Sequence, residues 1–151
     1  MNREIKFRGI SIDEWVYGML CKVNEGDTEH GEPIKYKIQT DEKEYGEYVQ
    51  CFITDESTIG QYTGLHDKNG KEIYEGDIVL YQDWEMAYEG GGNDSFINKG
   101  IVEYCEDNCC FNVTERQTVD IADVLYKGNE DLEVIGNIYE NPELLGGEDE
   151  R

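Results

Sequence analysis

A series of short strand-like runs separated by turn residues limits most strongly which fold this sequence can adopt. In residues 34–39 apolar and polar side chains alternate strictly, which places Ile34, Tyr36 and Ile38 on one face of a half-buried strand. Residues 5–8 alternate in the same way, whereas residues 15–20 are apolar on both faces, which is typical of a strand near the middle of a sheet. Together with a further candidate strand at 48–53, these runs predict a mostly β fold.

Two polar, glycine-containing segments separate the early runs. Residues 24–33 and 40–46 are rich in acidic side chains and contain no aliphatic residue. We expect both segments to be surface loops. Residues 1–60 are therefore expected to form an irregular β subdomain.

The second part of the chain has more regular spacing. Asn69-Gly70 lies between candidate strands at 62–65 and 72–74, and this dipeptide supplies the positive φ angles of a tight hairpin turn. A second turn at 75–77 leads to further candidate strands, which are residues 78–81, 101–104, 110–114 and 132–139. Short strands at this spacing predict a small β-barrel subdomain over residues 61–146.

Helix is expected in one or two short pieces. Asn141 is placed to cap a single turn that begins at Pro142 and packs Leu144 and Leu145 on the barrel, with Gly146 ending it. Residues 120–127 favour either a second short helix or a strand. Residues 89–95, with three consecutive glycines, are expected to be a mobile loop, and residues 147–151 a frayed acidic tail.

The net charge limits the classes of partner. Thirteen Lys and Arg against thirty-five Asp and Glu give −22. Residues 1–60 hold seven basic and thirteen acidic side chains, and residues 61–151 hold six and twenty-two, so the acidity is concentrated in the second part. Such a surface repels nucleic acid and attracts a basic protein.

The compartment is inferred from what the sequence lacks. No apolar run approaches the ~20 residues that a membrane-spanning helix needs, and the first residues contain no apolar signal region. Five cysteines form an odd set without the regular spacing of disulfide-rich secreted domains. We expect a soluble, cytoplasmic protein with reduced thiols.

Two segments carry residue types that bind metals. Cys105, Cys109 and Cys110 with His30 or His66 supply ligands that suit zinc, but the second closely spaced pair of a structural zinc site is missing. Residues 67–71 look like the start of a calcium loop, yet the glycine is fourth and Ile78 stands at the twelfth position, where an EF-hand has Glu. Buried thiols and a hairpin turn explain these segments better, so no metal or other cofactor is expected.

No catalytic motif is apparent. His30 and His66 are the conventional bases, and neither lies beside a nucleophile motif or a phosphate-binding glycine loop. Among thirty-five carboxylates, a pair in acid–base geometry can arise by chance. We therefore nominate no catalytic residue and keep a carboxylate-pair hydrolase as an alternative.

Four blocks of sequence carry a family resemblance. They are Arg3 to Gly9, Trp15 to Gly18, Gly60 to Val79 and Val134 to Leu144, the last containing Ile-Gly-Asn-Ile-Tyr-Glu-Asn-Pro. On these blocks the chain resembles the YopX-like family of bacteriophage and prophage proteins.

The resemblance implies a mostly β fold with an SH3-like barrel in the C-terminal part, and it brings no agreed catalytic residues. The glycine-rich segment 89–95 and the three clustered cysteines depart from the family pattern. Turn and packing roles are the better interpretation of six motif residues, which are Gly64, Gly70, Gly76, Asp77, Gly136 and Asn137.

These observations favour a non-enzymatic protein-interaction module whose acidic surface binds a basic host or phage protein. An acidic surface that serves solubility alone is the plainer interpretation. A further alternative is a self-assembling structural phage protein, in which Trp84, Met86 and Tyr88 form the contact surface. Lys6 and Arg8 are expected on an outward strand face, where they pair with neighbouring acids or contact nucleic acid.

Overall fold

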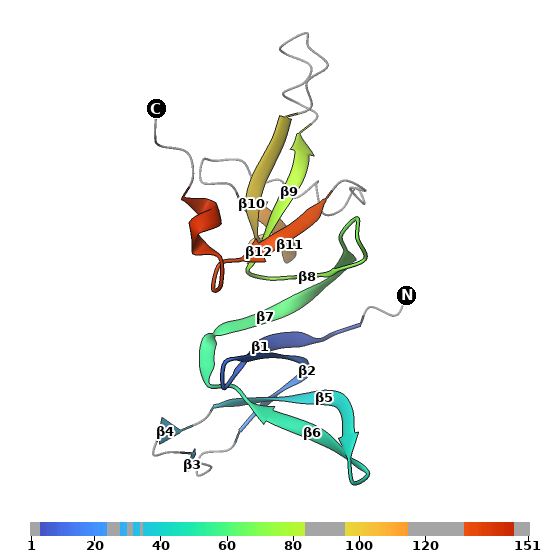
Figure 1. Cartoon of the computed structure of the whole chain (residues 1–151), viewed down its shortest axis with the longest axis vertical. Coiled ribbons are helices and arrows are strands. Elements are labelled where there is room, and N and C mark those ends of the chain that lie inside the picture. The colour runs from blue at the N-terminus through green and yellow to red at the C-terminus, as the bar shows by residue number, and fades with distance from the viewer. Residues whose placement is uncertain are drawn as a thin grey trace. The chain divides into compact units, whose positions relative to one another are not determined.

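A computed structural model describes residues 4–23, 28–29, 32–33, 35–83, 96–114 and 132–146. The chain divides into two compact units, Met1–Gly64 and Leu65–Arg151. The described residues are mostly β, arranged in antiparallel sheets, and Figure 1 labels the strands. The predicted mostly β class is confirmed.

The first unit contains one large antiparallel sheet. A separate two-stranded pair is formed by residues that lie between two strands of this sheet in the sequence. The strands of the unit are β1 (Phe7–Ser11), β2 (Glu14–Lys22), β3 (Thr28–Glu29), β4 (Glu32–Pro33), β5 (Tyr36–Glu44), β6 (Glu47–Phe52) and β7 (Asp55–His66). Hydrogen bonding orders these strands β6-β5-β2-β1-β7, with β8 (Glu72–Tyr74) as the sixth strand of the sheet next to β7, while β3 pairs with β4. The run at 15–20 lies in β2, an interior strand, as its two-sided apolar pattern predicts.

One face of this sheet carries the core of the first unit. Ile38 is fully buried and Ile53 is 3% exposed. Ile53 packs over Gly9, where a Cβ would lie 2.9 Å from its Cδ1 atom. Full burial of an aliphatic side chain of this size contributes ~1.5–3 kcal/mol.

The expected loop at 40–46 is wrong, because β5 continues to Glu44 and the chain turns at Tyr45-Gly46 (Figure 1). Tyr45 has φ +51° and Gly46 has φ +87°, the backbone that a two-residue hairpin turn between twisted strands requires. The segment is polar because both faces of β5 are exposed to solvent here, and it nevertheless forms a strand. Similarly, β3 and β4 occupy part of the expected loop at 24–33.

The second unit has a four-stranded sheet. The sheet consists of β9 (Asp77–Asp83), β10 (Phe96–Cys105), β11 (Cys110–Thr114) and β12 (Glu133–Asn137), and the unit also contains the strand β8 (Glu72–Tyr74) and the 3₁₀ turn η1 (Pro142–Leu145). The sheet order is β11-β10-β9-β12, and all pairs are antiparallel. Within the described residues its edge strands, β11 and β12, do not pair with each other, so the hydrogen-bonded sheet is open and not a closed barrel.

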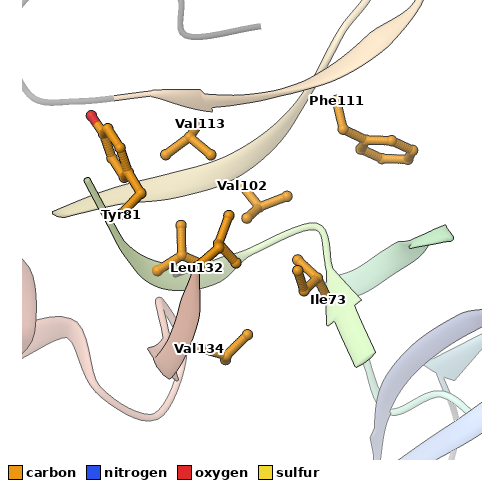
Figure 2. Packing of buried hydrophobic residues seen from close by; sticks show 8 residues of the cluster. Ile73, Tyr81, Val102, Phe111, Val113, Leu132 and Val134 are labelled. Atoms are coloured by element: carbon orange, nitrogen blue, oxygen red, sulfur yellow. The ribbon is translucent and has the colours of Figure 1, made fainter. Parts of the chain in front are cut away.

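The core of the second unit gathers side chains from each strand of that sheet and from β8. Figure 2 shows the cluster, which contains Ile73, Val79, Tyr81, Val102, Phe111, Val113, Leu132 and Val134. Val79, Val102 and Val113 are fully buried. Alternation along β10 and β11 brings Val102 and Val113 together as direct cross-strand partners.

The expected turn at Pro142 is present as η1, and the Gly146 N–H closes it by donating to the Glu143 carbonyl. The expected capping by Asn141 is wrong, since this side chain makes no cap hydrogen bond. Leu144 and Leu145 are half-buried, not core residues. The segments at 89–95, 120–127 and 147–151 lie outside the described residues.

The 67–71 turn differs in detail from the sequence expectation. Within this described loop, Gly70 alone has positive φ, +80°, whereas a two-residue Asn-Gly turn would place both residues there. The loop therefore needs its glycine and tolerates variation at Asn69.

Replacing Gly70 with Val should lower the free energy of unfolding by about 1–2 kcal/mol, because a β-branched residue is strained at positive φ. Space is not the cause, since no atom lies within 4 Å of a Cβ at this position. Chemical denaturation measures the change. Gly70→Asn is the matched control and should lose much less, because Asn tolerates the left-handed region; equal loss by both variants would contradict the backbone explanation.

Candidate functional site

Asp67, the residue that prompted the calcium comparison, has a structural role. Its side chain is buried, and Oδ1 accepts hydrogen bonds from the backbone N–H groups of Asn69 (2.8 Å) and Lys71 (2.9 Å). Oδ2 accepts from the Val134 N–H at 3.0 Å. Both carboxylate oxygens are therefore engaged in holding the hairpin loop to β12.

The neighbouring residue adds two more links to the same strand. The Lys68 N–H donates to the Leu132 carbonyl at 2.9 Å, and Lys68 Nζ lies 2.6 Å from Glu133 Oε2. Three interactions thus connect the loop with residues 132–134. This is a structural clamp, and we refer to it as the Asp67 clamp.

The environment of Asp67 has two opposing effects on the pKa of its carboxyl group. Burial raises the pKa of the carboxyl, while the N–H groups of Val134, Lys71 and Asn69 and the charge of Lys71 lower it. The lowering prevails, because three backbone donors stabilise the ionised form. Asp67 is therefore a poor general acid or base at neutral pH.

The closing sequence block also forms a turn. Asn137 Oδ1 accepts from the N–H groups of Tyr139 (3.0 Å) and Glu140 (2.9 Å), and its Nδ2 donates to Glu140 Oε2 at 2.8 Å. Asn141 Oδ1 accepts from the Asn137 N–H and lies 2.5 Å from where a Cβ on Gly136 would be. The family-like residues Gly136, Asn137 and Asn141 are thus fixed by one local hydrogen-bond network.

Two buried carboxylates occur among the described residues, and neither suits acid–base chemistry. Asp77 is 1% exposed and its Oδ2 accepts the Tyr74 N–H at 2.8 Å, just as Asp67 serves backbone donors. Both carboxylates act as turn supports.

The three clustered cysteines lie around the β10–β11 turn. Cys105 is the direct cross-strand partner of Cys110, and exposed Cys109 lies in the turn with φ +52°. In the part of the chain that the structure describes, no group of three or more metal-ligating residues occurs. His66 is exposed there, and His30 lies outside the described residues.

The N-terminal basic pair differs from the expectation. Arg8 is 4% exposed, so the expected outward position is wrong for this residue. Its guanidinium lies 4.6 Å from the ring centroid of Trp15, and Lys6 pairs with Glu4 at 3.6 Å. The strand therefore buries Arg8 against an aromatic ring instead of presenting it to a ligand.

Trp84, Met86 and Tyr88, the predicted contact residues, lie outside the described residues. The structure instead exposes apolar side chains in the first unit. Met19 is 61% exposed, Tyr48 48%, Tyr17 43% and Phe52 36%. We call these four residues the open face. Tyr17 and Met19 lie in β2, whose two-sided apolar pattern predicts only a strand near the middle of a sheet, and Tyr48 and Phe52 lie in β6.

The strand register places the open face on one side of the sheet. Met19 lies opposite Gln39, which lies opposite Gln50, and one row further Cys21, Lys37 and Phe52 are aligned. Because directly paired residues share a face, Met19 and Phe52 lie in adjacent rows of the same side. Buried Ile38 belongs to the opposite side.

The β5–β6 hairpin ends in an acidic segment, and its Glu44–Glu47 pair follows the Lys43–Tyr48 pair, so it lies on the opposite side of the strands from Tyr48 and Phe52. Asp41, Glu42, Glu44 and Glu47 are all exposed, and we call them the acidic hairpin end. Glu44 and Glu47 are direct cross-strand partners. Like charges in this position destabilise a hairpin, so the pairing weakens the free protein.

The chain is similar to known proteins over nearly its whole length. A family model described as YopX protein matches residues 6–146. The crystal structure of protein EF1440 from Enterococcus faecalis is similar, with 27% sequence identity and a TM-score of 0.51, covering 95% of this chain and 99% of that one. No curated protein matches. Among the described residues, no helix is long and apolar enough to cross a membrane.

Asp67→Asn should lower the free energy of unfolding by about 1–3 kcal/mol at neutral pH, because an amide group replaces one acceptor oxygen and faces a backbone donor. Since folding lowers the pKa of Asp67 below its usual 3.8, the carboxylate stabilises the native state above that pH. This contribution is lost as the pH falls through the folded-state pKa.

Urea denaturation at a series of pH values measures both effects. The native protein should lose stability on acidification below about pH 4, and Asp67→Asn should lose less over that range. Asp107→Asn, at an exposed acid in the β10–β11 turn, is the control. Parallel pH curves for the native protein and Asp67→Asn would show that the clamp is not ionic.

Proposed function

Because this chain belongs to the YopX family, we propose that it is a non-enzymatic protein-interaction module of phage or prophage origin. Its acidic surface binds a basic host or phage protein in the bacterial cytoplasm. The net charge of −22 provides long-range attraction for such a partner and repels nucleic acid.

The observation that carries this proposal is the direct pairing of Glu44 with Glu47. Two facing carboxylates at the end of a hairpin repel each other and destabilise the free protein. Among the described residues, neither carboxylate has an ion-pair partner that would offset this repulsion. A Lys or Arg side chain from another protein placed between the two carboxylates would relieve the repulsion. The repulsion that destabilises the folded protein would thus be relieved on binding, which favours the complex.

The buried carboxylates support the non-enzymatic part of the proposal. Asp67 and Asp77 hold backbone N–H groups, so their chemistry is committed to structure. A carboxylate-pair hydrolase would need two carboxyl groups converging on a substrate cleft. The paired Glu44 and Glu47 are instead exposed at the hairpin end.

Self-assembly is a second candidate, favoured by the exposed apolar side chains of the open face. A surface with these residues can pack against a second copy. The net charge of −22 opposes that association, most strongly at low salt. Light scattering over a concentration series distinguishes the two functions, since the interaction module should stay near 17.4 kDa.

The acidic hairpin end is tested with Glu44→Gln/Glu47→Gln. We expect the free variant to melt at a slightly higher temperature, because the like-charge pair is gone. Its affinity for a basic partner captured from nuclease-treated lysate should fall several-fold, and the native affinity should decrease steeply with salt.

The matched control is Glu106→Gln/Asp107→Asn, which removes the same charge from the exposed β10–β11 turn. This control should bind nearly as the native protein does. Equal weakening in both variants would show that total charge alone matters. Capture of no basic protein at any salt concentration would contradict the proposed function.

A further inference from the structure

Strand β6 is an edge of the first sheet. It pairs with β5 on one side and, among the described residues, with no strand on the other. The opposite edge, β8, has three residues, whereas β6 has six, of which four are exposed and none is buried. An edge strand of this length presents a row of backbone donors and acceptors to any chain that can pair with it.

The hydrogen bonds between β5 and β6 show which backbone groups of β6 face the free edge. The Ile53 N–H donates to the Tyr36 carbonyl at 3.0 Å, and the Val49 carbonyl accepts from the Thr40 hydroxyl at 3.3 Å. The odd-numbered residues of this segment therefore point their backbone groups toward β5. Because this direction alternates along an antiparallel strand, the even-numbered residues point their N–H and C=O groups outward. These residues are Tyr48, Gln50 and Phe52.

β6 lacks the features that usually protect an edge strand. Natural edges carry Lys or Pro, or a bulge bends them away from other chains. β6 contains neither residue type. Where its pairing with β5 is irregular, between Gln39 and Lys43, the extra residues belong to β5. The charged residue of β6 is Glu47, which faces Glu44. Residues 48–52 are thus open to the addition of a strand.

A strand added at this edge would meet side chains on both sides of β6. One side presents Tyr48 and Phe52 with Gln50 between them, and the other presents Glu47 and Val49. Aromatic and β-branched side chains pair favourably with aromatic residues across strands, and a Lys or Arg pairs favourably with Glu47. The same cation would relieve the repulsion between Glu47 and its like-charged partner on β5. The edge therefore selects for a strand whose two sides differ.

We propose that β6 binds an extended segment of the basic partner as an additional strand of the sheet. The segment places aromatic or β-branched side chains beside Tyr48 and Phe52, and a Lys or Arg beside Glu47. Backbone pairing supplies affinity in strand addition, and alternate side chains supply specificity. The assignment rests on the proposed function, because it identifies where and how the basic partner binds.

The probe is the end-blocked synthetic peptide Tyr-Val-Thr-Val-Tyr-Lys, whose antiparallel pairing places its Lys opposite Glu47 and its two Tyr opposite Tyr48 and Phe52. One N-methylated version blocks the N–H groups of Thr and the second Tyr, which point toward β6. Another blocks those of the two Val, which point away. Calorimetry measures affinity, and amide chemical shifts map binding on the full chain.

We expect the unmodified peptide and the Val-methylated version to bind with chemical-shift changes in β6. The version methylated at Thr and Tyr should bind about tenfold more weakly, because two backbone hydrogen bonds are lost. A version with Glu in place of Lys should bind several-fold more weakly than the unmodified peptide, because its carboxylate would face Glu47.

Gln50→Pro tests the same edge on the protein. Proline removes an N–H that points outward and none that bonds to β5, so the variant should fold and melt near the native temperature. Its affinity for the unmodified peptide should fall about tenfold. Gln50→Thr retains the N–H and is the matched control, which should bind like the native protein. If the proline variant does not fold, the N-methylated peptides test these hydrogen bonds on the native chain.

The outcomes separate this assignment from the proposed function. Equal affinity of the two N-methylated versions, or shifts that map outside β6, would overturn strand addition. The proposed function would then stand if the chain still captures a basic protein in a salt-dependent manner, and would fall if it captures none. A doubled mass in light scattering that Gln50→Pro abolishes would assign the edge to a second copy of this chain and overturn the proposal.

Discussion

The second unit depends on one carboxylate that serves three backbone donors. Asp67 accepts N–H groups from its own loop and from Val134, so a single side chain both shapes a hairpin and attaches the last strand, β12, to it. The strand attached in this way supplies Val134 to the core cluster (Figure 2). Packing of the core and hydrogen bonding of the buried carboxylate therefore depend on each other. The carboxylate is tolerated in the interior because each of its oxygens accepts a hydrogen bond. The donors are in place because the core positions the strand.

The two units assign their acidic residues to opposite tasks. In the second unit, buried Asp67 and Asp77 complete backbone hydrogen bonding. In the first unit, the acidic hairpin end remains in water, and Glu44 faces Glu47 without benefit to the fold. The first arrangement contributes to the stability of the fold, whereas the second leaves two like charges facing each other. The net charge of the chain does not distinguish these two roles. They are distinguished by where each carboxylate lies, in a loop or at the end of a strand.

The sequence was most informative where side-chain periodicity and turn chemistry act locally. Alternation identified the half-buried strand containing Ile38, and Asn69-Gly70 located a hairpin, because both signals arise from a few adjacent residues. It failed where a residue's role is set by distant neighbours. The polar segment at 40–46 became a strand through cross-strand pairing, Arg8 was buried beside Trp15, and β2 was left exposed on one side. The bond between Asp67 and Val134 spans 67 positions and leaves no local signal.

The Tyr45-Gly46 turn has a consequence for how this chain can vary. The two-residue turn fixes the pairing next to it, Glu44 with Glu47 and Lys43 with Tyr48, and an irregularity between Gln39 and Lys43 shifts the register of the remaining pairs. Inserting a single residue at the turn would exchange the two sides of β6, sending Phe52 inward and Cys51 outward, because side chains alternate with a period of two. The outer residues can be substituted freely, whereas insertions and deletions here alter both sides of the sheet at once. Diversification of this surface is thus confined to point substitutions.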